Sequence, residues 1–278
     1  MANNGLSKAE IVERALEFGA EFVGFAPVER WREFNDVPEA FHPQQIWGNA
    51  KSVIVVGVPL WLPLIDAAPN VLGREQAIVT NDLLAEVGYR LTLLLSRSGF
   101  QALNVPQTGH RDIVPTDSSL EAFPQSWAGY YAGLGTIGWN HTLLTREYGP
   151  RLQLGSVFTS LEIEGDPMLE NDLCIKCLNC KRICPAQALT GDNRTAYAQV
   201  DYTGCIQNET RLQAAYCEPC GACIKVCPVG EDRKLFQSNN FEKYLKEENI
   251  LAEDANAKEY RDWVHIRSYG SYSLARNK

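Results

Sequence analysis

The first 173 residues of this chain contain no cysteine, and all nine cysteines lie between Cys174 and Cys227. A chain of 278 residues buries a core large enough to fold without disulfide staples. Disulfides that stabilise a whole fold would also be spread along its length. The confinement of the cysteines to one short region therefore indicates a local metal site and argues against a disulfide framework.

Long apolar runs are also missing. No stretch approaches the roughly 18 apolar residues that a membrane helix needs, so we expect no membrane partner. The N-terminus, MANNGLSKAE, has neither a basic region followed by an apolar run nor a pair of arginines. This pattern predicts no signal peptide and a cytoplasmic location.

Positive charge is scarce as well. The 26 Lys and Arg residues are outnumbered by 34 Asp and Glu, which gives a net charge of −8 at pH 7. This balance disfavours broad, nonspecific binding to nucleic acid. Hydrophobic residues make up 45% of the chain and charged residues 22%, a composition typical of soluble globular proteins.

Before the cysteines, helix and strand patterns alternate. Ser7 and Glu10 form a capping box that opens a helix ending near Gly19. The Val/Ile run of residues 51–59 predicts a strand buried on both faces. Apolar spacing predicts the other elements, which are strands over 21–27, 100–105 and 148–160 and a long helix over 74–97. This alternation predicts an α+β protein whose first domain covers residues 1–166.

The segment Gly165-Asp166-Pro167 marks the predicted end of that domain. A cysteine-containing domain is expected over residues 167–230. The C-terminal tail, 231–278, is polar and charged, and one helix is expected over 241–252. Its mixture of basic and aromatic residues would either pack as an arm against the fold or contact a partner.

The cysteines form two runs with the same spacing, C-x2-C-x2-C-x3-C-P. This spacing lets one tight loop present three thiolates to a [4Fe–4S] cluster, and the cysteine before the proline reaches the other cluster in two-cluster ferredoxins. Structural zinc sites pair two C-x2–4-C units and need neither a third cysteine nor a trailing C-P. The predicted ligands are Cys174, Cys177, Cys180 and Cys227 for one cluster and Cys184, Cys217, Cys220 and Cys223 for the other.

Cys205, the ninth cysteine, leaves one choice open. It is either a small buried apolar residue, which is a common role for free cysteine, or a ligand that replaces Cys217. Spacing alone favours Cys217.

Four stretches outside the cysteine runs resemble a known family. They are AKSVIVVGVP (50–59), AGLGTIGWN (132–140), LLTREYGPR (143–151) and GSVFT (155–159). Their order, followed by two ferredoxin-type runs, is similar to that of the cobalamin-dependent reductases, which include the epoxyqueuosine reductases and the reductive dehalogenases. The resemblance covers about residues 5–230 and is firm from Ala132 onward.

In that family the N-terminal part has a nitroreductase-like fold and holds a base-off corrinoid that the clusters reduce. The resemblance therefore implies a nitroreductase-like first domain, bound cobalamin and a two-cluster ferredoxin-like domain. Glycines let the backbone approach a large flat ring, and aromatic side chains offer planar faces. The alternative for the glycine-rich loop is a tight turn with core aromatics. The implied cofactor-binding residues are Gly133, Leu134, Gly135, Gly138, Trp139, Asn140, Tyr148 and Gly149.

A reductase also needs a proton donor, which must be a phenol, an imidazole or a carboxyl group near the reacting atom. The candidate catalytic residues are Tyr130, Tyr131, His141 and Asp117, and His110 is a further candidate. Each has a structural alternative: the tyrosines could be core residues with a tethered hydroxyl, and His141 could cap the following strand.

Two functional hypotheses remain. The first is a reductase that takes electrons from a ferredoxin, a flavodoxin or a reductase and passes them through two clusters to a corrinoid, for reduction of an unknown small molecule. The second is an electron-transfer protein without its own corrinoid that serves a partner, such as a corrinoid protein. The AGLG and EYGPR segments favour the first. Trp139, where epoxyqueuosine reductases have lysine, and the lack of the family's tyrosine motif in 67–76 favour the second.

Overall fold

The computed structural model describes residues 5–34, 36–105 and 123–269, and these form two compact units that alternate along the chain. Unit 1 contains Met1–Pro59, Thr80–Ile137 and Leu152–Leu173. Unit 2 contains Leu60–Val79, Gly138–Arg151 and Cys174–Lys278. The sequence predicted boundaries near residues 166 and 230, whereas unit 2 combines two segments from before residue 166 with the cysteine runs and the C-terminal residues. Among the described residues, no helix is both long and apolar enough to cross a membrane.

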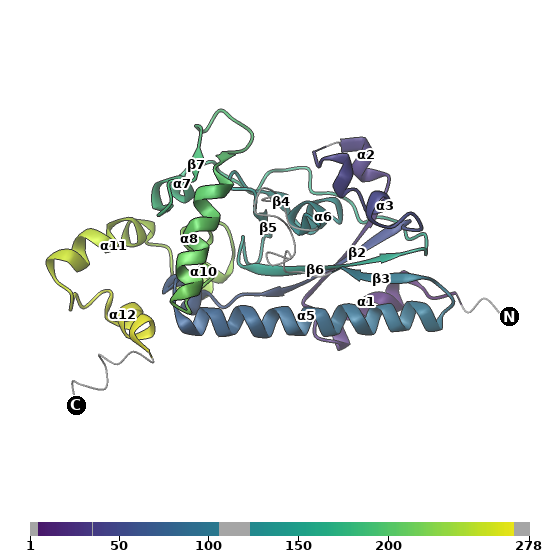
Figure 1. Ribbon diagram of the computed structural model, residues 1–278, viewed down its shortest axis with the longest axis horizontal. Helices are drawn as coiled ribbons and strands as arrows, with labels where there is room; N and C mark the ends of the chain where they lie inside the picture. Colours follow the sequence, from purple (N-terminus) through teal and green to yellow (C-terminus); the bar gives the residue numbers. More distant parts are fainter. Residues whose placement is uncertain (1–4, 35, 106–122, 270–278) are drawn as a thin grey trace. The chain divides into compact units, whose positions relative to one another are not determined.

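Unit 1 is built on a four-stranded antiparallel sheet with the order β1-β2-β6-β3 (Figure 1). The strands are β1 (Phe22–Pro27), β2 (Ser52–Pro59), β6 (Leu152–Thr159) and β3 (Ala102–Val105). Seven of the eight residues of β2 are buried. Its Val/Ile-rich sequence suits this central position, because β-branched side chains pack well on a pleated surface. The predicted doubly buried strand is confirmed.

One face of the sheet is covered by α1 (Lys8–Glu17) and by the long helix α5 (Val71–Arg97) (Figure 1). The hydroxyl of Ser7 accepts a hydrogen bond from the N–H of Glu10 at 3.1 Å, so the predicted cap of α1 is present. The residues that α5 buries in the core recur every three or four positions, as one helix face requires: Leu84, Val87, Leu91 and Leu95.

The opposite face of the sheet is covered by α6 (Gln125–Tyr131), which packs against β1, β2 and β6 (Figure 1). An aromatic cluster joins α6 to α2 (Arg30–Phe34). The ring of Trp31 stacks on Phe123 at 5.9 Å and meets Tyr131 edge-on at 4.8 Å. Three short elements complete this part: η1 (Glu39–Phe41), α3 (Pro43–Ile46) and β4 (Thr136–Ile137).

Unit 2 consists of short helices and loops around the cysteine runs. Its helices in chain order are α4 (Leu62–Asp66), α7 (Asn179–Ile183), α8 (Tyr202–Ala214), α9 (Ala222–Lys225), α10 (Asp232–Leu235), α11 (Phe241–Glu253) and α12 (Arg261–Ser268). Its strands are β5 (Leu143–Leu144), β7 (Leu189–Thr190) and β8 (Gln199–Val200), of which the last two pair antiparallel. The helices of the two cysteine runs, α7 and α9, pack against each other.

The C-terminal arm, residues 241–268, belongs to the core of unit 2. Tyr244 of α11 stacks on Trp263 of α12 with ring centroids 5.2 Å apart. These rings share one apolar cluster with Val226, and Cys180 packs against it. The helix predicted over 241–252 is present as α11, and the arm shields part of the first cysteine run.

Candidate iron–sulfur centre

Cys174, Cys177 and Cys180 of the first run line a cavity in unit 2, together with Cys227 of the second run. These four cysteines, called group 1 below, are the set that the sequence predicted for one cluster. Cys223 also reaches the cavity. The rest of the wall is largely apolar, and it includes Trp139, Leu144, Leu178, Pro228 and Val229. The fold therefore places four thiols around one volume in surroundings of low polarity.

The two cysteine runs fold alike. Leu178 has a left-handed φ of 60° directly before α7, and Gly221 has a φ of 65° at the corresponding place before α9. In each run the short helix thus begins between the second and third cysteines. Glycine adopts this conformation without cost, whereas leucine does not. The first run therefore carries local strain that the second avoids.

Burial raises the pKa of Cys180 to about 12 and that of Cys227 to about 11. The thiolates of Cys174 and Cys177 raise both values further, so the sulfurs of group 1 lie close enough to repel one another when ionised. Metal coordination removes the proton from a thiol outright. A bound cluster would thus supply the positive charge that four neighbouring thiolates need.

No three Cys, His, Asp or Glu side chains in the described part of the chain converge on a single-ion site. A tetrahedral zinc ion gathers its thiolates at about 2.3 Å from the metal. In a four-iron cluster each thiolate binds a different iron atom, so the sulfurs surround a volume and stay apart. The arrangement of group 1 around a cavity fits a cluster better than it fits zinc.

A second set of thiols, called group 2, contains Cys184, Cys220 and Cys223. Burial is the main cause of the raised pKa of both Cys220 and Cys223. The thiolate of Cys184 adds to the shift at Cys220, and those of Cys220 and Cys205 add to the shift at Cys223, whose pKa is about 12. Group 2 therefore joins the last cysteine of the first run to the second run, as predicted.

The position of helix α8 helps to identify the fourth member of group 2. The N–H of Cys220 donates to the carboxylate of Glu209 on α8 at 3.0 Å, and Cys205 lies one turn before Glu209 on the same helix. Cys217 instead donates its S–H to the carbonyl of Leu212, with 3.6 Å between S and O. The groups that raise its pKa, burial first, include no cysteine. The placement favours Cys205, whereas the sequence spacing favoured Cys217.

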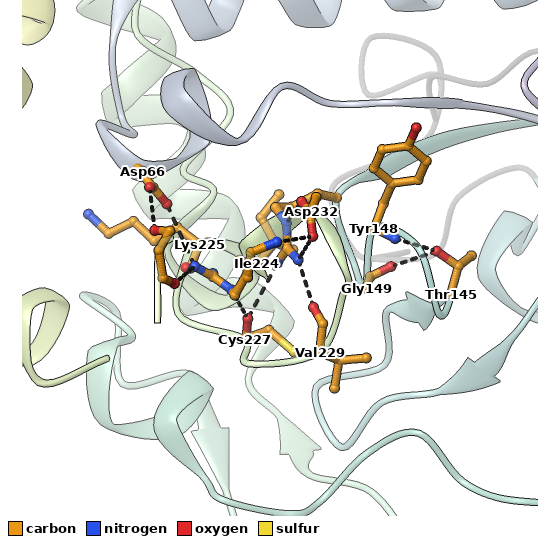
Figure 2. Close-up of polar contacts among 12 residues, drawn as sticks. Asp66, Thr145, Tyr148, Gly149, Ile224, Lys225, Cys227, Val229 and Asp232 are labelled. Atoms are coloured by element: carbon orange, nitrogen blue, oxygen red, sulfur yellow. Dashed lines mark hydrogen bonds and ion pairs between the residues drawn. The ribbon is translucent and has the colours of Figure 1, made fainter. Parts of the chain in front are cut away.

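Arg151 anchors the loop that follows Cys227, and Figure 2 labels its acceptors Asp232, Val229 and Cys227. The side chain is fully buried, and its Nε and Nη2 atoms donate to the two carboxylate oxygens of Asp232, both at 2.6 Å. Nη2 also donates to the carbonyl of Val229 at 2.6 Å, and Nη1 donates to that of Cys227 at 3.3 Å. Such a bidentate pair is both strong and geometrically specific, so it fixes the course of this loop.

Arg233 bonds the same cysteine from another side. Its Nε donates to the carbonyl of Cys227 at 2.6 Å, and its Nη1 donates to the hydroxyl of Tyr244 at 3.0 Å. Tyr244 in turn donates to Asp66 at 2.8 Å. The carbonyl of Cys227 thus accepts hydrogen bonds from two guanidinium groups. Sequence reasoning missed Asp66, Asp232 and Arg233, because their partners are distant along the chain.

The 4Fe–4S dicluster domain family matches residues 173–231, which contain both runs. Over 192 residues the chain is 26% identical to a tetrachloroethene reductive dehalogenase of Desulfitobacterium hafniense, an alignment that covers 64% of this chain and 32% of the relative. Over 104 residues it is 35% identical to an epoxyqueuosine reductase of Pseudomonas aeruginosa, covering 35% and 29% of the two chains.

The fold agrees with these relatives. A catabolic reductive dehalogenase matches 95% of this chain and 38% of its own with a TM-score of 0.64 at 21% identity. An epoxyqueuosine reductase solved with a tRNA stem loop matches 80% of this chain and 64% of its own, with a TM-score of 0.51 at 18% identity. This chain is a diverged relative of both reductase families. It spans about a third of the length of the tetrachloroethene reductive dehalogenase that it matches.

Two residues of this chain that the resemblance implies in corrinoid binding contact cysteines instead. The backbone N–H of Trp139 donates to the sulfur of Cys174 at 3.4 Å. The side chain of Asn140 bonds Cys223 and lowers the pKa that burial raises. The indole of Trp139 is buried and donates to the Asp192 carbonyl at 3.1 Å. Its ring is therefore part of the core around the cysteines and is not an open planar face.

Three of the implied cofactor-binding glycines pack tightly against other atoms of the chain. A Cβ at Gly133 would overlap the carbonyl of Pro167, and one at Gly149 would overlap the carbonyl of Val229. A Cβ at Gly138 would meet the Asn140 side chain at 2.8 Å. The tight-turn alternative therefore explains why glycine is needed at these positions.

The other implied cofactor residues are placed as follows. Leu134 is half-buried and packs beside Gly24, while Gly135 is buried. The N–H of Tyr148 donates to Thr145 at 3.1 Å, and its ring points away from Cys227 (Figure 2).

Of the catalytic candidates, the tyrosines have a carboxylate partner that sequence reasoning missed. The hydroxyl of Tyr131 donates to Asp36 at 3.4 Å, and burial raises the pKa of both groups. Tyr130 lies beside Tyr131, with ring centroids 5.7 Å apart, and burial raises its pKa too. Tyr131 is buried in the aromatic cluster, as its structural alternative proposed.

His141 lies in unit 2 with its Nε2 atom 2.9 Å from the carbonyl of Ala198. Because a carbonyl only accepts, Nε2 carries the proton, and Nδ1 is left as the basic nitrogen. The candidates Asp117 and His110 lie outside the described residues.

Proposed function

We propose that this chain is an iron–sulfur oxidoreductase that passes electrons through two [4Fe–4S] clusters to a corrinoid, for reduction of a small molecule. The observation that carries this proposal is the cavity that Cys227 of the second run lines together with Cys174, Cys177 and Cys180 of the first. Exchange of the last cysteine between runs is the pattern of two-cluster ferredoxins. The relation to two reductase families supports the destination of the electrons.

Group 1 would hold one cluster, and group 2 would hold the other with Cys205 as its fourth ligand. The hydrogen bonds from Trp139 and Asn140 to cysteine sulfurs suit this role. Such bonds withdraw charge from the sulfur and so stabilise the reduced cluster. Residues implied in cofactor contact would thus act on the clusters.

A corrinoid, when bound, supplies a cobalt centre that accepts electrons and carries the reductive chemistry. Unit 1, for which a nitroreductase-like fold stays our prediction, would hold it. Tyr130, which is half-buried, would hold a proton for the substrate, since burial raises its pKa and keeps the phenol protonated, while Asp36 bonds the neighbouring Tyr131. Asp36 joins the list of candidates on this geometry.

The electron donor would approach at the exposed edge of group 1. Cys177 is exposed, and Ile175 beside it is 69% exposed. The amines of Lys176 and Lys181 bond only backbone carbonyls in the contacts described, those of Thr195 and Gly191. In a chain of net charge −8, this cationic edge suits an acidic carrier such as a flavodoxin or ferredoxin.

Anaerobic purification with iron and sulfide assays, followed by titration with cobalamin, tests the proposal. We expect about eight iron atoms per chain, four for each cluster, and a shift of the cobalamin spectrum to the base-off form. Iron near four per chain would contradict the two-cluster claim. An unchanged spectrum with both clusters loaded would contradict the corrinoid claim.

The second candidate, an electron-transfer protein without its own corrinoid, keeps support from two observations. Trp139 is buried among the cysteines, and the glycines of the implied loop close on the chain's own atoms. In that case the cluster-loaded protein would leave the cobalamin spectrum unchanged but would still reduce a separately bound corrinoid protein.

A further inference from the structure

Arg151 uses all of its side-chain donors inside unit 2. Beyond Asp232, its three acceptors are the carbonyls of Ile224, Cys227 and Val229, at 3.5, 3.3 and 2.6 Å. These carbonyls flank the last cysteine on both sides (Figure 2). The guanidinium therefore fits the backbone around Cys227, and this fit is more specific than a charge pair alone would require.

Two glycines make this close approach possible. Gly149 has a φ of 55°, and a Cβ there would overlap the carbonyl of Val229. Gly230 has a φ of 124°, and a Cβ there would overlap the Arg151 guanidinium. The segment EYGPR (147–151) thus packs against the segment CPVGED (227–232), and each segment contributes one glycine to the contact. This fit gives EYGPR a role within the cysteine unit.

The charges around Cys227 do not cancel. Arg151 pairs with Asp232, and Arg233 lies 3.9 Å from Asp66. Glu247 is the partner of two further cations: Lys225, at 3.4 Å, and Arg267. This connected network has one more cation than carboxylates among the described contacts. The cationic ends of Arg151 and Arg233 face the Cys227 carbonyl.

We infer that Arg151 is a positioning residue for Cys227 and, through it, raises the reduction potential of the cluster held by group 1. The inference rests on the proposed function, because it requires that cluster. Reduction adds one negative charge to the cluster. A fixed guanidinium at the carbonyl of a ligand stabilises that charge in surroundings of low dielectric. Asp232 on the far side of Arg151 opposes the effect in part.

Two variants shift the potential in opposite directions if this is correct. Asp232→Asn keeps one of the two acceptor oxygens that Arg151 uses and removes the opposing charge, so the group 1 potential rises. Arg151→Gln combined with Asp232→Asn removes the whole pair without leaving a buried unpaired charge, so the potential falls. We expect changes on the order of tenfold in the equilibrium constant for reduction, which is 59 mV for one electron.

The matched control is Arg194→Gln combined with Asp192→Asn. This pair has the same N–O distance of 2.6 Å, but its Arg194 side chain is 87% exposed. The measurements are iron per chain and an anaerobic redox titration followed by electron paramagnetic resonance, which resolves the two clusters. The control should leave both potentials unchanged, because solvent screens exposed charges.

Opposite shifts of one cluster, or loss of that cluster alone from the double variant, support the inference. Full iron content with both potentials unchanged from wild type overturns it. If both variants shift the reduction potential in the same direction, the inference is also overturned, because a purely structural disturbance does not follow the sign of the charge that is removed. The wild-type protein separates this test from that of the proposed function: if it lacks about eight iron atoms, the cluster proposal fails first.

Discussion

The two cysteine runs of unit 2 share one spacing and the same turn before their short helices, yet groups 1 and 2 lie among different charges. Group 1 lies beside Arg151, which lowers the pKa that burial raises at Cys227. Group 2 lies beside Glu209, which adds to the raised pKa of Cys220 after burial. A duplicated motif thus sets the ligands, while the charges of distant segments make the two sites different.

The difference in nearby charge predicts which of the two clusters has the higher reduction potential. Positive charge near a cluster stabilises its reduced state, and negative charge destabilises it. We therefore expect the cluster of group 1 to have the higher potential.

The largest effect, on iron content, is expected at the fourth ligand of group 2, for which Cys205 and Cys217 are the two candidates. Cys205→Ala should lose one cluster, so that iron per chain falls by about half, because α8 places Cys205 with Cys220. Cys217→Ala is the matched control and should keep its iron, since that thiol bonds the carbonyl of Leu212. Iron and sulfide assays on anaerobically reconstituted protein decide the matter. The reverse result would restore the assignment that spacing favoured.

An intermediate effect, a loss of thermal stability, is expected from Gly149→Ala. This change should weaken the packing of the EYGPR segment against the Cys227 loop. The positive φ and the contact with Val229 make an added Cβ costly, by about 2–3 kcal/mol. The midpoint of thermal unfolding should fall by about 5–10 °C. Gly48→Ala is the control, because no atom lies within 4 Å of a Cβ at that position. Equal midpoints for the two variants would show that the EYGPR segment tolerates separation from the Cys227 loop.

The smallest effect is expected from the cationic edge of group 1. Lys176→Glu combined with Lys181→Glu should slow reduction of the clusters by a flavodoxin about tenfold at low salt, because rim charges act mainly on association rates. High salt should remove the difference. Stopped-flow absorbance measures the rate.

The control for this prediction lies on the group 2 side, where Arg211→Glu changes the charge of an exposed α8 residue. It should leave the rate within about twofold of the wild type. A larger effect from Arg211→Glu would place the electron entry at group 2.

Much of unit 1 could be predicted from local patterns. The Val/Ile run of β2 and the apolar stripe of α5 were identified, because alternating or three-to-four-residue spacing reports burial directly. Helices α6 and α8 were missed. The sequence of α8 has no clear apolar stripe, and Leu212 is the one residue that this helix buries. Packing against the second cysteine run, rather than an apolar stripe, fixes α8 in place.

The candidate site shows the same division. The spacing of the runs predicted all four members of group 1, since a cluster imposes its own geometry on nearby cysteines. For the fourth ligand of group 2 the spacing favours Cys217, whereas helix α8 places Cys205 one turn from Glu209, which bonds Cys220. The glycines and Trp139 were interpreted as a cofactor cradle, yet within the described residues they contact the chain itself.

The sequence by itself determined that this chain carries two ferredoxin-type runs and that Cys227 joins the first of them, because cluster ligands must lie at short, fixed spacings. Tertiary structure decided which buried charges surround each run. Arg151 and Asp232 are 81 positions apart, and Asp66 is 178 positions from its partner Tyr244. No local pattern reports such contacts, since they depend on how separate segments pack around the same loop.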